Sequence, residues 1–328
     1  MTFQTRRLGR SDLWVSAIGM GCNAIGGPMW DRSVRADLPV GYGEVDDAES
    51  IRAIHRALDL GINFFDTADE YGCGHSEMIL GKALGQKRNS VVISTKFGFT
   101  YSEQSREVTG KDASPAYIRQ ACEASLRRLG RDFIDIYLLH IRDLDLEPAL
   151  LVRETLESLV TEGKIRWYGW STDDPGRARL FAEGQHCAAI EHRLNLFLDA
   201  PEMLALCEEV DLASINRIPL LMGVLSGRYT PDRLPPEDDV RSLFFRHSLF
   251  AADIERVNQL KTILTKGNRT LAQGALAWIL SRSLITIPIP GFRSVAQVEE
   301  NAGTLQLCPF SPEEMRAIQT VLHQPLAN

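Results

Sequence analysis

Short apolar runs and longer amphipathic segments follow one another along the chain. Eight runs of strand length are almost continuously apolar, and segments with the apolar period of a helix lie between them. Strands of this kind, apolar on both faces, are typical of a parallel sheet covered by helices. The predicted strands are residues 16–22, 62–68, 90–97, 133–140, 165–171, 187–192, 212–218 and 284–290.

The intervening segments show the complementary helical pattern. One apolar face recurs over residues 51–58, 118–129 and 151–160. Residues typical of helix boundaries agree with this division of the chain. Ser114 with Pro115 and, further on, Thr270 mark helix starts, and Gly130 and Gly163 mark helix ends.

Eight strand-then-helix units predict a (β/α)8 TIM barrel, because a doubly wound sheet rarely reaches that count. We expect a single domain over residues 1–328, with an N-terminal hairpin within residues 6–19 and an extra C-terminal helix over residues 311–324. Residues 226–250 are too long and too rich in proline for a simple connection. We expect this segment to lie over the C-terminal mouth of the barrel.

Charge and composition narrow the classes of function. The net charge of −7 and the absence of a basic run of five or more residues argue against a nucleic-acid-binding surface. The N-terminus is polar, without the apolar region of a signal peptide, and no stretch reaches the length of a membrane span, so we predict a cytoplasmic protein. The six cysteines form no CxxC pair, which favours reduced thiols over a disulfide framework or a zinc site.

Four residues that can hold or move protons stand at the ends of the second, third and fourth predicted strands: Asp66, Tyr71, Lys96 and His140. Active sites of such barrels lie at the C-terminal ends of the strands. An ammonium beside a phenol stabilises the phenolate and lowers the pKa of the phenol, and a carboxylate keeps that ammonium charged. We therefore expect Lys96 to lie between Asp66 and Tyr71, and His140 to orient a carbonyl oxygen.

Taken singly, these residues also have structural explanations. Asp66 is suited to cap a turn, Tyr71 to be an ordinary loop aromatic, and His140 to be a hydrogen-bonded core residue. Lys96 lies between two apolar runs, where an ammonium has to be paired. The occurrence of all four at neighbouring strand ends favours a catalytic interpretation.

The segments FDTADEYG, STKFG, LLH, GWS and IPGFRSVAQVEEN resemble the aldo-keto reductase family, in particular its bacterial, potassium-channel-β-subunit-like branch, over residues 5–310. The resemblance implies a barrel that binds NADPH without a Rossmann domain, with Asp66, Tyr71, Lys96 and His140 as its catalytic residues. Hydride would pass to the carbonyl carbon of an aldehyde or ketone while Tyr71 protonates the oxygen. The implied partner is a small carbonyl compound; its identity and the oligomeric state stay open.

The resemblance also implies a set of cofactor-binding residues. The segment after the last strand would hold the adenosine 2′-phosphate and the adenine, and an arginine beside a helix N-terminus suits a phosphate. The segment PLLMGVLSGR would lie over the pyrophosphate. The implied residues are Gly291, Arg293, Gln297, Glu300 and Asn301 in the first segment, and Pro219, Leu220, Gly223, Ser226, Gly227 and Arg228 in the second.

Three positions depart from the family pattern around the nicotinamide. Glu191 stands where an amide is usual, and a carboxylate cannot donate a hydrogen bond. Arg217 stands where an aromatic residue often stacks on the ring, although a guanidinium plane can also stack. In the segment GWSTDD, Ser171 matches the serine of a Ser-Asn pair that is usual in the family. Whether Thr172 or Asp173 takes the place of the asparagine is left open. We expect these differences to act on affinity for the oxidised cofactor.

The segment GMGCNAIGG has two glycines after a strand, but the third is Gly26 and no helix is predicted there, so a dinucleotide fingerprint is not indicated. A tight loop over the cofactor fits better, with Gly21 in contact with it. Trp30 in the same loop is a candidate substrate contact or, equally, a packed lid residue.

Other functions deserve comparison. Lys96 as a Schiff-base nucleophile would require a neutral amine, which Asp66 opposes. A cofactor-binding redox sensor with weak turnover is compatible with all four residues. A metal-dependent barrel hydrolase is less well supported, because no His, Asp or Glu cluster has ligand spacing.

Overall fold

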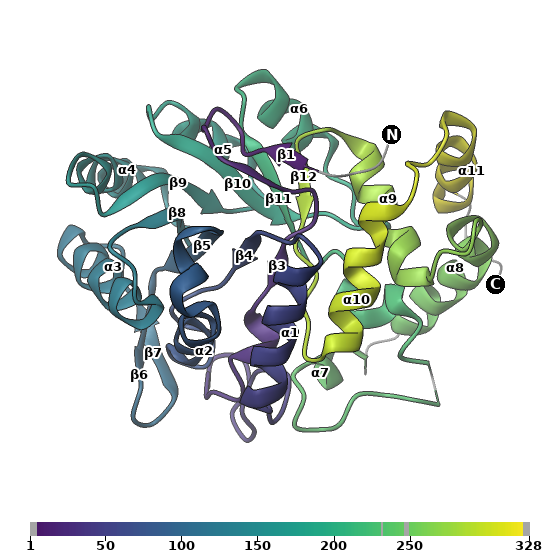
Figure 1. The fold of residues 1–328 in the computed structure, drawn as a ribbon, viewed down its shortest axis with the longest axis horizontal. Helices are drawn as coiled ribbons and strands as arrows, with labels where there is room; N and C mark the ends of the chain where they lie inside the picture. Colours follow the sequence, from purple (N-terminus) through teal and green to yellow (C-terminus); the bar gives the residue numbers. More distant parts are fainter. Residues whose placement is uncertain (1–4, 231, 246–248, 324–328) are drawn as a thin grey trace.

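The computed structural model describes residues 5–230, 232–245 and 249–323. Within these residues a parallel sheet of eight strands forms the centre of the molecule, and helices surround it (Figure 1). Every one of the eight predicted strands is present. In chain order they are β3 (Met20–Gly21), β4 (Phe64–Asp66), β5 (Val92–Phe97), β8 (Ile134–Leu139), β9 (Ile165–Ser171), β10 (Cys187–Arg193), β11 (Ala213–Arg217) and β12 (Thr286–Pro288).

The sheet follows chain order from β3 to β12, and its two ends meet. The amides of Gly19 and Gly21 donate to the carbonyls of Pro288 and Pro290, at 3.0 Å in both cases. A side chain at Gly21 would collide with the carbonyl oxygen of Ile289, 2.8 Å from a Cβ placed there. The predicted (β/α)8 barrel is therefore confirmed, and a glycine is required where it closes.

Helices cover the outside of the barrel. Those predicted from periodicity are present, and their caps agree with the sequence: the Ser114 side chain accepts from the amide of Tyr117, and Thr270 forms a reciprocal capping box with Gln273. The helices are α1 (Asp47–Asp59), α2 (His75–Leu84), α3 (Pro115–Leu129), α4 (Leu146–Thr161), α5 (Pro175–Ala182), α6 (Pro201–Glu209), α7 (Arg241–Phe245), α8 (Leu249–Leu264), α9 (Leu271–Arg282), α10 (Val295–Gly303) and α11 (Pro312–His323). Among the described residues, 3-10 turns lie at η1 (Asn23–Ile25), η2 (Gly85–Asn89), η3 (Leu221–Ser226) and η4 (Thr304–Gln306).

The predicted N-terminal hairpin, β1 (Thr5–Arg7) and β2 (Trp14–Ser16), closes the barrel end opposite the candidate site. Its Leu8 is fully buried in a cluster with Phe64 and Ile136 from the barrel strands. Gly9, with φ +55°, lies against the carbonyl oxygen of Ala188, 2.1 Å from the position of a Cβ, so no larger residue fits. The predicted C-terminal helix is α11.

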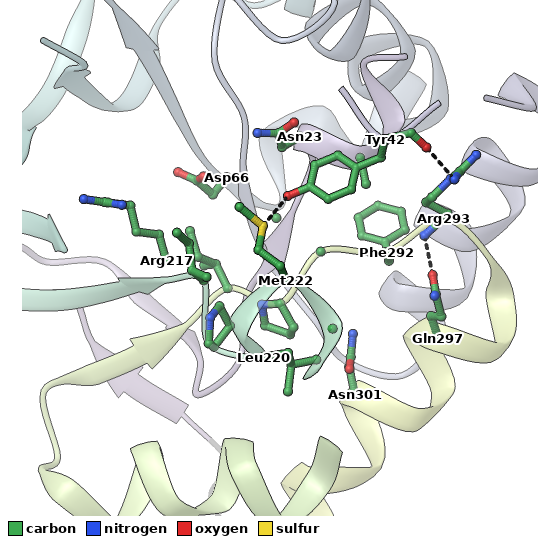
Figure 2. A pocket seen from close by; sticks show the side chains of 18 of the residues that line it. Asn23, Tyr42, Asp66, Arg217, Leu220, Met222, Phe292, Arg293, Gln297 and Asn301 are labelled. Carbon is green, nitrogen blue, oxygen red and sulfur yellow. Dashed lines mark hydrogen bonds between the residues drawn. The ribbon is translucent and has the colours of Figure 1, made fainter. Parts of the chain in front are cut away.

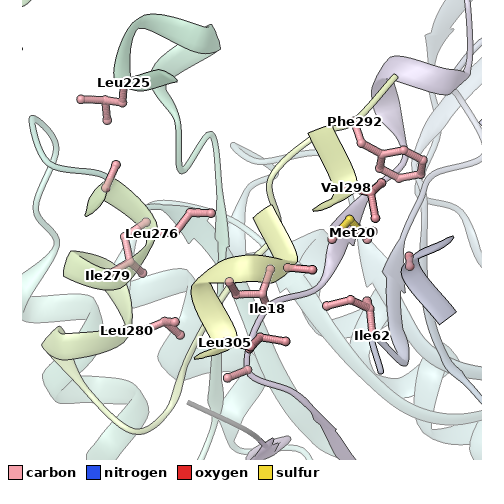
Figure 3. Packing of buried hydrophobic residues seen from close by; sticks show 14 of the residues in the cluster. Ile18, Met20, Ile62, Leu225, Leu276, Ile279, Leu280, Phe292, Val298 and Leu305 are labelled. Atoms are coloured by element: carbon pink, nitrogen blue, oxygen red, sulfur yellow. The ribbon is translucent and has the colours of Figure 1, made fainter. Parts of the chain in front are cut away.

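A larger apolar cluster joins the outer helices to the strands. Figure 3 shows Ile18 and Met20 of the first strand region packed near Leu276 and Ile279 of α9, Val298 of α10 and other buried side chains. Burial of this surface fixes α10 against the barrel edge, beside the point where the barrel closes. No helix in the described part of the chain is both long and apolar enough to cross a membrane.

Two segments differ from the simple barrel pattern. Residues 99–111, where no strand was predicted, form the hairpin β6 (Phe99–Ser102) and β7 (Glu107–Lys111). The segment 226–250, expected as one long loop, contains α7 and the start of α8, while residues 231 and 246–248 lie outside the described residues. Apolar spacing did not reveal β6, β7 and α7, because elements of four or five residues carry too few periods to recognise.

Candidate active site

The ends of β4, β5 and β8 bring the four predicted catalytic side chains together. Asp66 ends β4, Lys96 lies next to the end of β5, His140 follows β8, and Tyr71 lies in the loop after β4. The Lys96 ammonium donates to the Asp66 carboxylate at 2.5 Å and to the carbonyl of Thr67 at 2.9 Å. The ammonium lies 5.2 Å from the centroid of the Tyr71 ring. Neighbouring parallel strands therefore bring together Asp66, Lys96 and His140, which are far apart in the sequence.

The turn that carries Tyr71 depends on a glycine. Gly72 has φ +62°, and a Cβ there would lie 1.9 Å from the carbonyl oxygen of Gly26 in the loop after β3. The two loops can approach this closely only without a side chain. The close approach holds the phenol over the barrel mouth.

A second carboxylate also reaches Lys96. Glu191 on β10 places Oε2 3.1 Å from the ammonium nitrogen, and its Oε1 accepts from the Ser171 hydroxyl at 3.1 Å. Lys96, Asp66 and Glu191 are all buried, with at most 2% of their surface exposed. The sequence placed Glu191 at the cofactor, but its ion pair with Lys96 was not predicted, because the two residues are far apart in the chain.

Burial and these charges set the protonation of the site. Burial lowers the pKa of Lys96, but Asp66 and Glu191 outweigh it and raise that pKa well above its usual value. A permanently charged ammonium disfavours the Schiff-base alternative. Burial, and then Glu191, raise the pKa of Asp66 to about 8.

The pKa expected for the phenol requires a correction. Burial raises the pKa of Tyr71 above its usual value; Lys96 lowers it, while Asp66, Glu191 and Glu70 raise it further. The prediction that Lys96 brings about a net lowering is therefore wrong for this arrangement. The main physical reason is burial, which disfavours the charged phenolate, and the nearby carboxylates add to it.

His140 is buried beside the phenol, with its ring 5.8 Å from the Tyr71 ring in an edge-on arrangement. Burial, with Lys96, Arg142 and Arg217, holds the pKa of His140 well below its usual value. Its Nδ1 lies 3.4 Å from Oε1 of Glu70. The imidazole is therefore neutral at pH 7 and carries one N–H that can donate to an oxygen.

A cavity of about 450 Å³ opens from this cluster and continues to α10 (Figure 2). Most of the predicted site residues line it. They are Gly21, Asp66, Tyr71, His140, Glu191, Arg217, Pro219, Leu220, Gly223, Ser226, Arg228, Gly291, Arg293, Gln297, Glu300 and Asn301.

Four predicted site residues do not line the cavity: Lys96, which lies behind Asp66, and Ser171, Gly227 and Trp30. The backbone of Trp30 pairs with the β7 hairpin, donating to the carbonyl of Arg106 at 2.7 Å. Its indole packs under the Arg32 guanidinium, 5.1 Å away. Of the two predicted roles, substrate contact and packed lid residue, this position is closer to the second.

Several cavity residues were not predicted, among them Asn23, Tyr42, Arg142, Met222 and Arg241. Tyr42 comes from the segment before α1, and Arg241 from the segment 226–250, which was expected to lie over the barrel mouth. The Tyr42 hydroxyl lies 3.5 Å from the Met222 sulfur (Figure 2), and the Arg241 guanidinium lies 4.7 Å from the Tyr42 ring centroid. The sequence feature that could have identified them as cavity residues is an aromatic or a basic side chain in a glycine-rich or proline-rich loop.

The departure after β9 and the departure on β11 are in contact. Arg217 donates to Asp173 at 2.6 Å, and Asp173 also pairs with Arg193 at 2.8 Å. Asp173 is therefore engaged by two guanidinium groups, and the Thr172 hydroxyl donates to the carbonyl of Arg142. Burial lowers the pKa of Arg217.

At the other end of the cavity, Arg293 precedes α10. Its guanidinium donates to the carbonyls of Tyr42, at 2.6 Å, and Glu44, and its amide donates to the Gln297 side chain (Figure 2). The Glu49 carboxylate accepts from the amide of Val295 at the start of α10. The arginine expected to bind a phosphate thus also secures the 42–44 loop.

Comparison with known proteins defines the class. The sequence model of the Aldo/keto reductase family matches residues 17–323, and the chain therefore belongs to the aldo/keto reductase family. It is 31% identical over 316 residues to the aldo-keto reductase yakc (NADP(+)) of Schizosaccharomyces pombe, covering 94% of this chain and 88% of that protein. It is 31% identical over 314 residues to the NADH-specific methylglyoxal reductase of Escherichia coli K12, covering 92% of this chain and 93% of that protein.

Solved structures agree with this assignment. The glycerol dehydrogenase AKR11B4 from Gluconobacter oxydans matches with a TM-score of 0.85 at 31% identity, covering 100% of this chain and 98% of that one. An aldo-keto reductase from Klebsiella pneumoniae in complex with NADPH matches with a TM-score of 0.70 at 28% identity, covering 100% and 98%. The branch of the family to which this chain belongs stays a prediction.

Proposed function

We propose that this protein is an NADPH-dependent oxidoreductase that reduces an aldehyde or ketone to an alcohol, and that residues 1–328 act as one catalytic unit. The observation that carries the proposal is the buried Asp66–Lys96 pair beside Tyr71 and His140, at the end of a cavity long enough to continue to α10. Membership of the family and the NADP(H) named for two of the similar proteins support it.

The cavity residues fit a dinucleotide. The side-chain nitrogen of Asn301 is buried without a hydrogen-bond partner among the described residues, and Asn301 lines the cavity, so a donor is available to a ligand (Figure 2). Arg293, Gln297 and Asn301 would hold the adenosine end. Pro219, Leu220 and Ser226 would lie along the middle, and Glu191 and Arg217 at the nicotinamide end. When bound, the cofactor supplies the hydride.

The chain's own residues supply the proton and the orientation. Tyr71 donates its proton to the carbonyl oxygen, and neutral His140 donates a hydrogen bond to the same oxygen without adding a full positive charge. Lys96, kept charged by its carboxylates, stabilises the phenolate that is left. The raised pKa of Tyr71 keeps the phenol protonated at neutral pH, as proton donation during reduction requires.

Tyr71→Phe tests this assignment. We expect reduction of a panel of aldehydes, ketones and sugars to fall by about 100-fold or more, because a general acid is lost. NADPH affinity, measured by fluorescence titration, should stay within about threefold, because one hydroxyl contributes little contact area.

Tyr101→Phe is the matched control, since Tyr101 on β6 does not line the cavity. It should retain nearly full activity. Retention of more than a few per cent of activity by Tyr71→Phe would contradict the assigned role. Tight NADPH binding by the wild-type protein with negligible turnover of the whole panel would favour a redox-sensing function.

A further inference from the structure

The buried cluster of Asp66, Lys96 and Glu191 contains two carboxylates and one ammonium. The ammonium nitrogen lies 2.5 Å from Asp66 and 3.1 Å from Glu191. When both carboxylates are ionised, the cluster carries one negative charge in excess. An unbalanced buried charge is costly, because the protein interior screens and solvates charge poorly.

Nearby titratable groups on the adjoining elements do not supply the missing positive charge. Burial raises the pKa of the Cys22 thiol, after β3, and of the Tyr71 phenol, so both are neutral at pH 7. Burial lowers the pKa of His140 well below its usual value and that of His192, on β10, to about 4. These four groups therefore carry no charge under physiological conditions.

Three arginines, Arg142, Arg193 and Arg217, lie at the rim, and the ion pairs that Arg193 and Arg217 form are both with Asp173. Arg217 faces the cluster from β11 and interacts electrostatically with Glu191, but its ion pair is with Asp173, at 2.6 Å. Arg142 faces Glu70 and His140 from the loop after β8. Burial raises the pKa of Glu70 to about 7, while Arg142, Lys96 and Lys111 lower it and Asp31 raises it.

Two carboxylate oxygens in the cluster also lack a hydrogen bond to the described residues: Oδ1 of Asp66 and Oε2 of Glu191, the latter in ionic contact with Lys96 only. Both residues line the cavity at the end that holds Tyr71 and His140. A nicotinamide that delivers hydride to a carbonyl between those two residues must lie at this end.

We propose that Glu191 gives this cluster one negative charge in excess, so that the cluster holds a proton, which it releases when the cationic, oxidised form of the nicotinamide cofactor binds. The proposal rests on the proposed function, because it requires a nicotinamide at this end of the cavity. Glu191 is then a positioning residue. It pairs with Lys96, and its negative charge raises the affinity of the site for the oxidised nicotinamide relative to the reduced one.

The protonation of the free cluster supports this. Burial and Glu191 raise the pKa of Asp66 to about 8, so that the cluster holds a proton near neutral pH. A cation nearby favours the deprotonated form. Affinity for the oxidised cofactor therefore rises with pH up to the pKa of the free cluster, and levels off above it.

The experiment compares NADP⁺ with NADPH, because their phosphates are the same and only the ring charge differs. Proton release on binding is measured in weakly buffered solution with an indicator dye, and dissociation constants are measured from pH 6 to pH 9. For the wild-type protein at pH 7 we expect release of close to one proton with NADP⁺ and close to none with NADPH. The ratio of the two dissociation constants should shift toward NADP⁺ by up to about tenfold per pH unit below the pKa.

Glu191→Gln removes the excess charge and keeps the shape. It should abolish the difference in proton release and weaken NADP⁺ relative to NADPH at pH 8 by roughly tenfold. Glu191→Asp retains the charge and should keep the pH dependence, which separates charge from packing. Glu70→Gln, which removes the neighbouring carboxyl group, should also keep it.

Equal proton release with both ligands, or an unchanged difference in Glu191→Gln, would overturn the proposal while leaving the proposed function intact. Loss of the pH dependence in Glu70→Gln would assign the proton to Glu70 and overturn it too. Failure of the wild-type protein to bind either nucleotide would overturn the proposed function and this inference together.

Discussion

The charge state around Lys96 depends both on residues that the sequence predicted to lie near it and on one that it did not. Its position after a buried strand already required a counter-ion, and Asp66 was the predicted one. The structure adds Glu191 at 3.1 Å, which changes the net charge of the cluster and raises the pKa of Tyr71. Burial is the largest cause of the raised pKa of the phenol, and Asp66, Glu191 and Glu70 add to it against the opposing effect of Lys96.

His192 gives a prediction at the same scale. Its buried ring donates from Nδ1 to the carbonyl of Arg193 and accepts at Nε2 from Ser214, and burial lowers its pKa to about 4. The unfolded chain takes up a proton below about pH 6.5, whereas the folded protein does not until about pH 4. This histidine therefore lowers the free energy of unfolding as pH falls across that interval, by about 3 kcal/mol in total.

His192→Gln should make the free energy of unfolding, measured by urea denaturation between pH 7.5 and pH 4.5, less dependent on pH than in the wild-type protein. His323→Gln on α11, an exposed histidine, is the control and should leave the pH dependence as it is. An identical pH slope for His192→Gln and the wild-type protein would contradict this account.

At the scale of elements, local signals predicted the helices well wherever a cap and a clear period coincide. α3 begins at Ser114 with Pro115 and is followed by Gly130 in the left-handed conformation, as its sequence indicates. The β6–β7 hairpin and α7 were missed, because short elements carry few periods and are held by contacts with distant segments.

Thr270→Ala tests the best-formed cap. The Thr270 hydroxyl accepts from the amide of Gln273, whose side chain accepts from the amide of Thr270 in return. Loss of the hydroxyl should lower the free energy of unfolding by about 1 kcal/mol, measured by chemical denaturation.

The control for that change is Thr320→Ala in α11, where the exposed hydroxyl only donates back to the carbonyl of Arg316. Its effect should stay within about 0.5 kcal/mol. Equal effects of the two substitutions would mean that the cap contributes nothing beyond an ordinary surface threonine.

At the scale of the whole molecule, three segments far apart in sequence meet over the cavity. Tyr42 comes from the loop before α1, Arg241 from the start of α7, and Arg293 from the turn before α10. Arg293 holds the backbone of the first loop through the carbonyls of Tyr42 and Glu44. This arrangement gives the arginine a structural role that its sequence motif did not reveal.

Arg293→Ala should therefore affect two properties. The dissociation constant of NADPH should rise by tenfold or more, because a charge-assisted contact with the 2′-phosphate is lost. The dissociation constant of NADH should rise by only about threefold. NADH has no 2′-phosphate, so the substitution affects its binding only through the 42–44 loop that Arg293 holds. Isothermal titration with both nucleotides measures the two effects, and equal losses would place the phosphate elsewhere.

The sequence alone determined the barrel and the identity of its four central side chains, because apolar runs, helical periods and strand-end residues are local properties of the chain. Only the tertiary structure decided that Lys96 has two carboxylates, that Trp30 pairs with a hairpin and that Arg293 secures a loop. Those facts depend on distances between segments that barrel closure brings together, and the energy of a buried charge depends on every charge within a few ångströms of it.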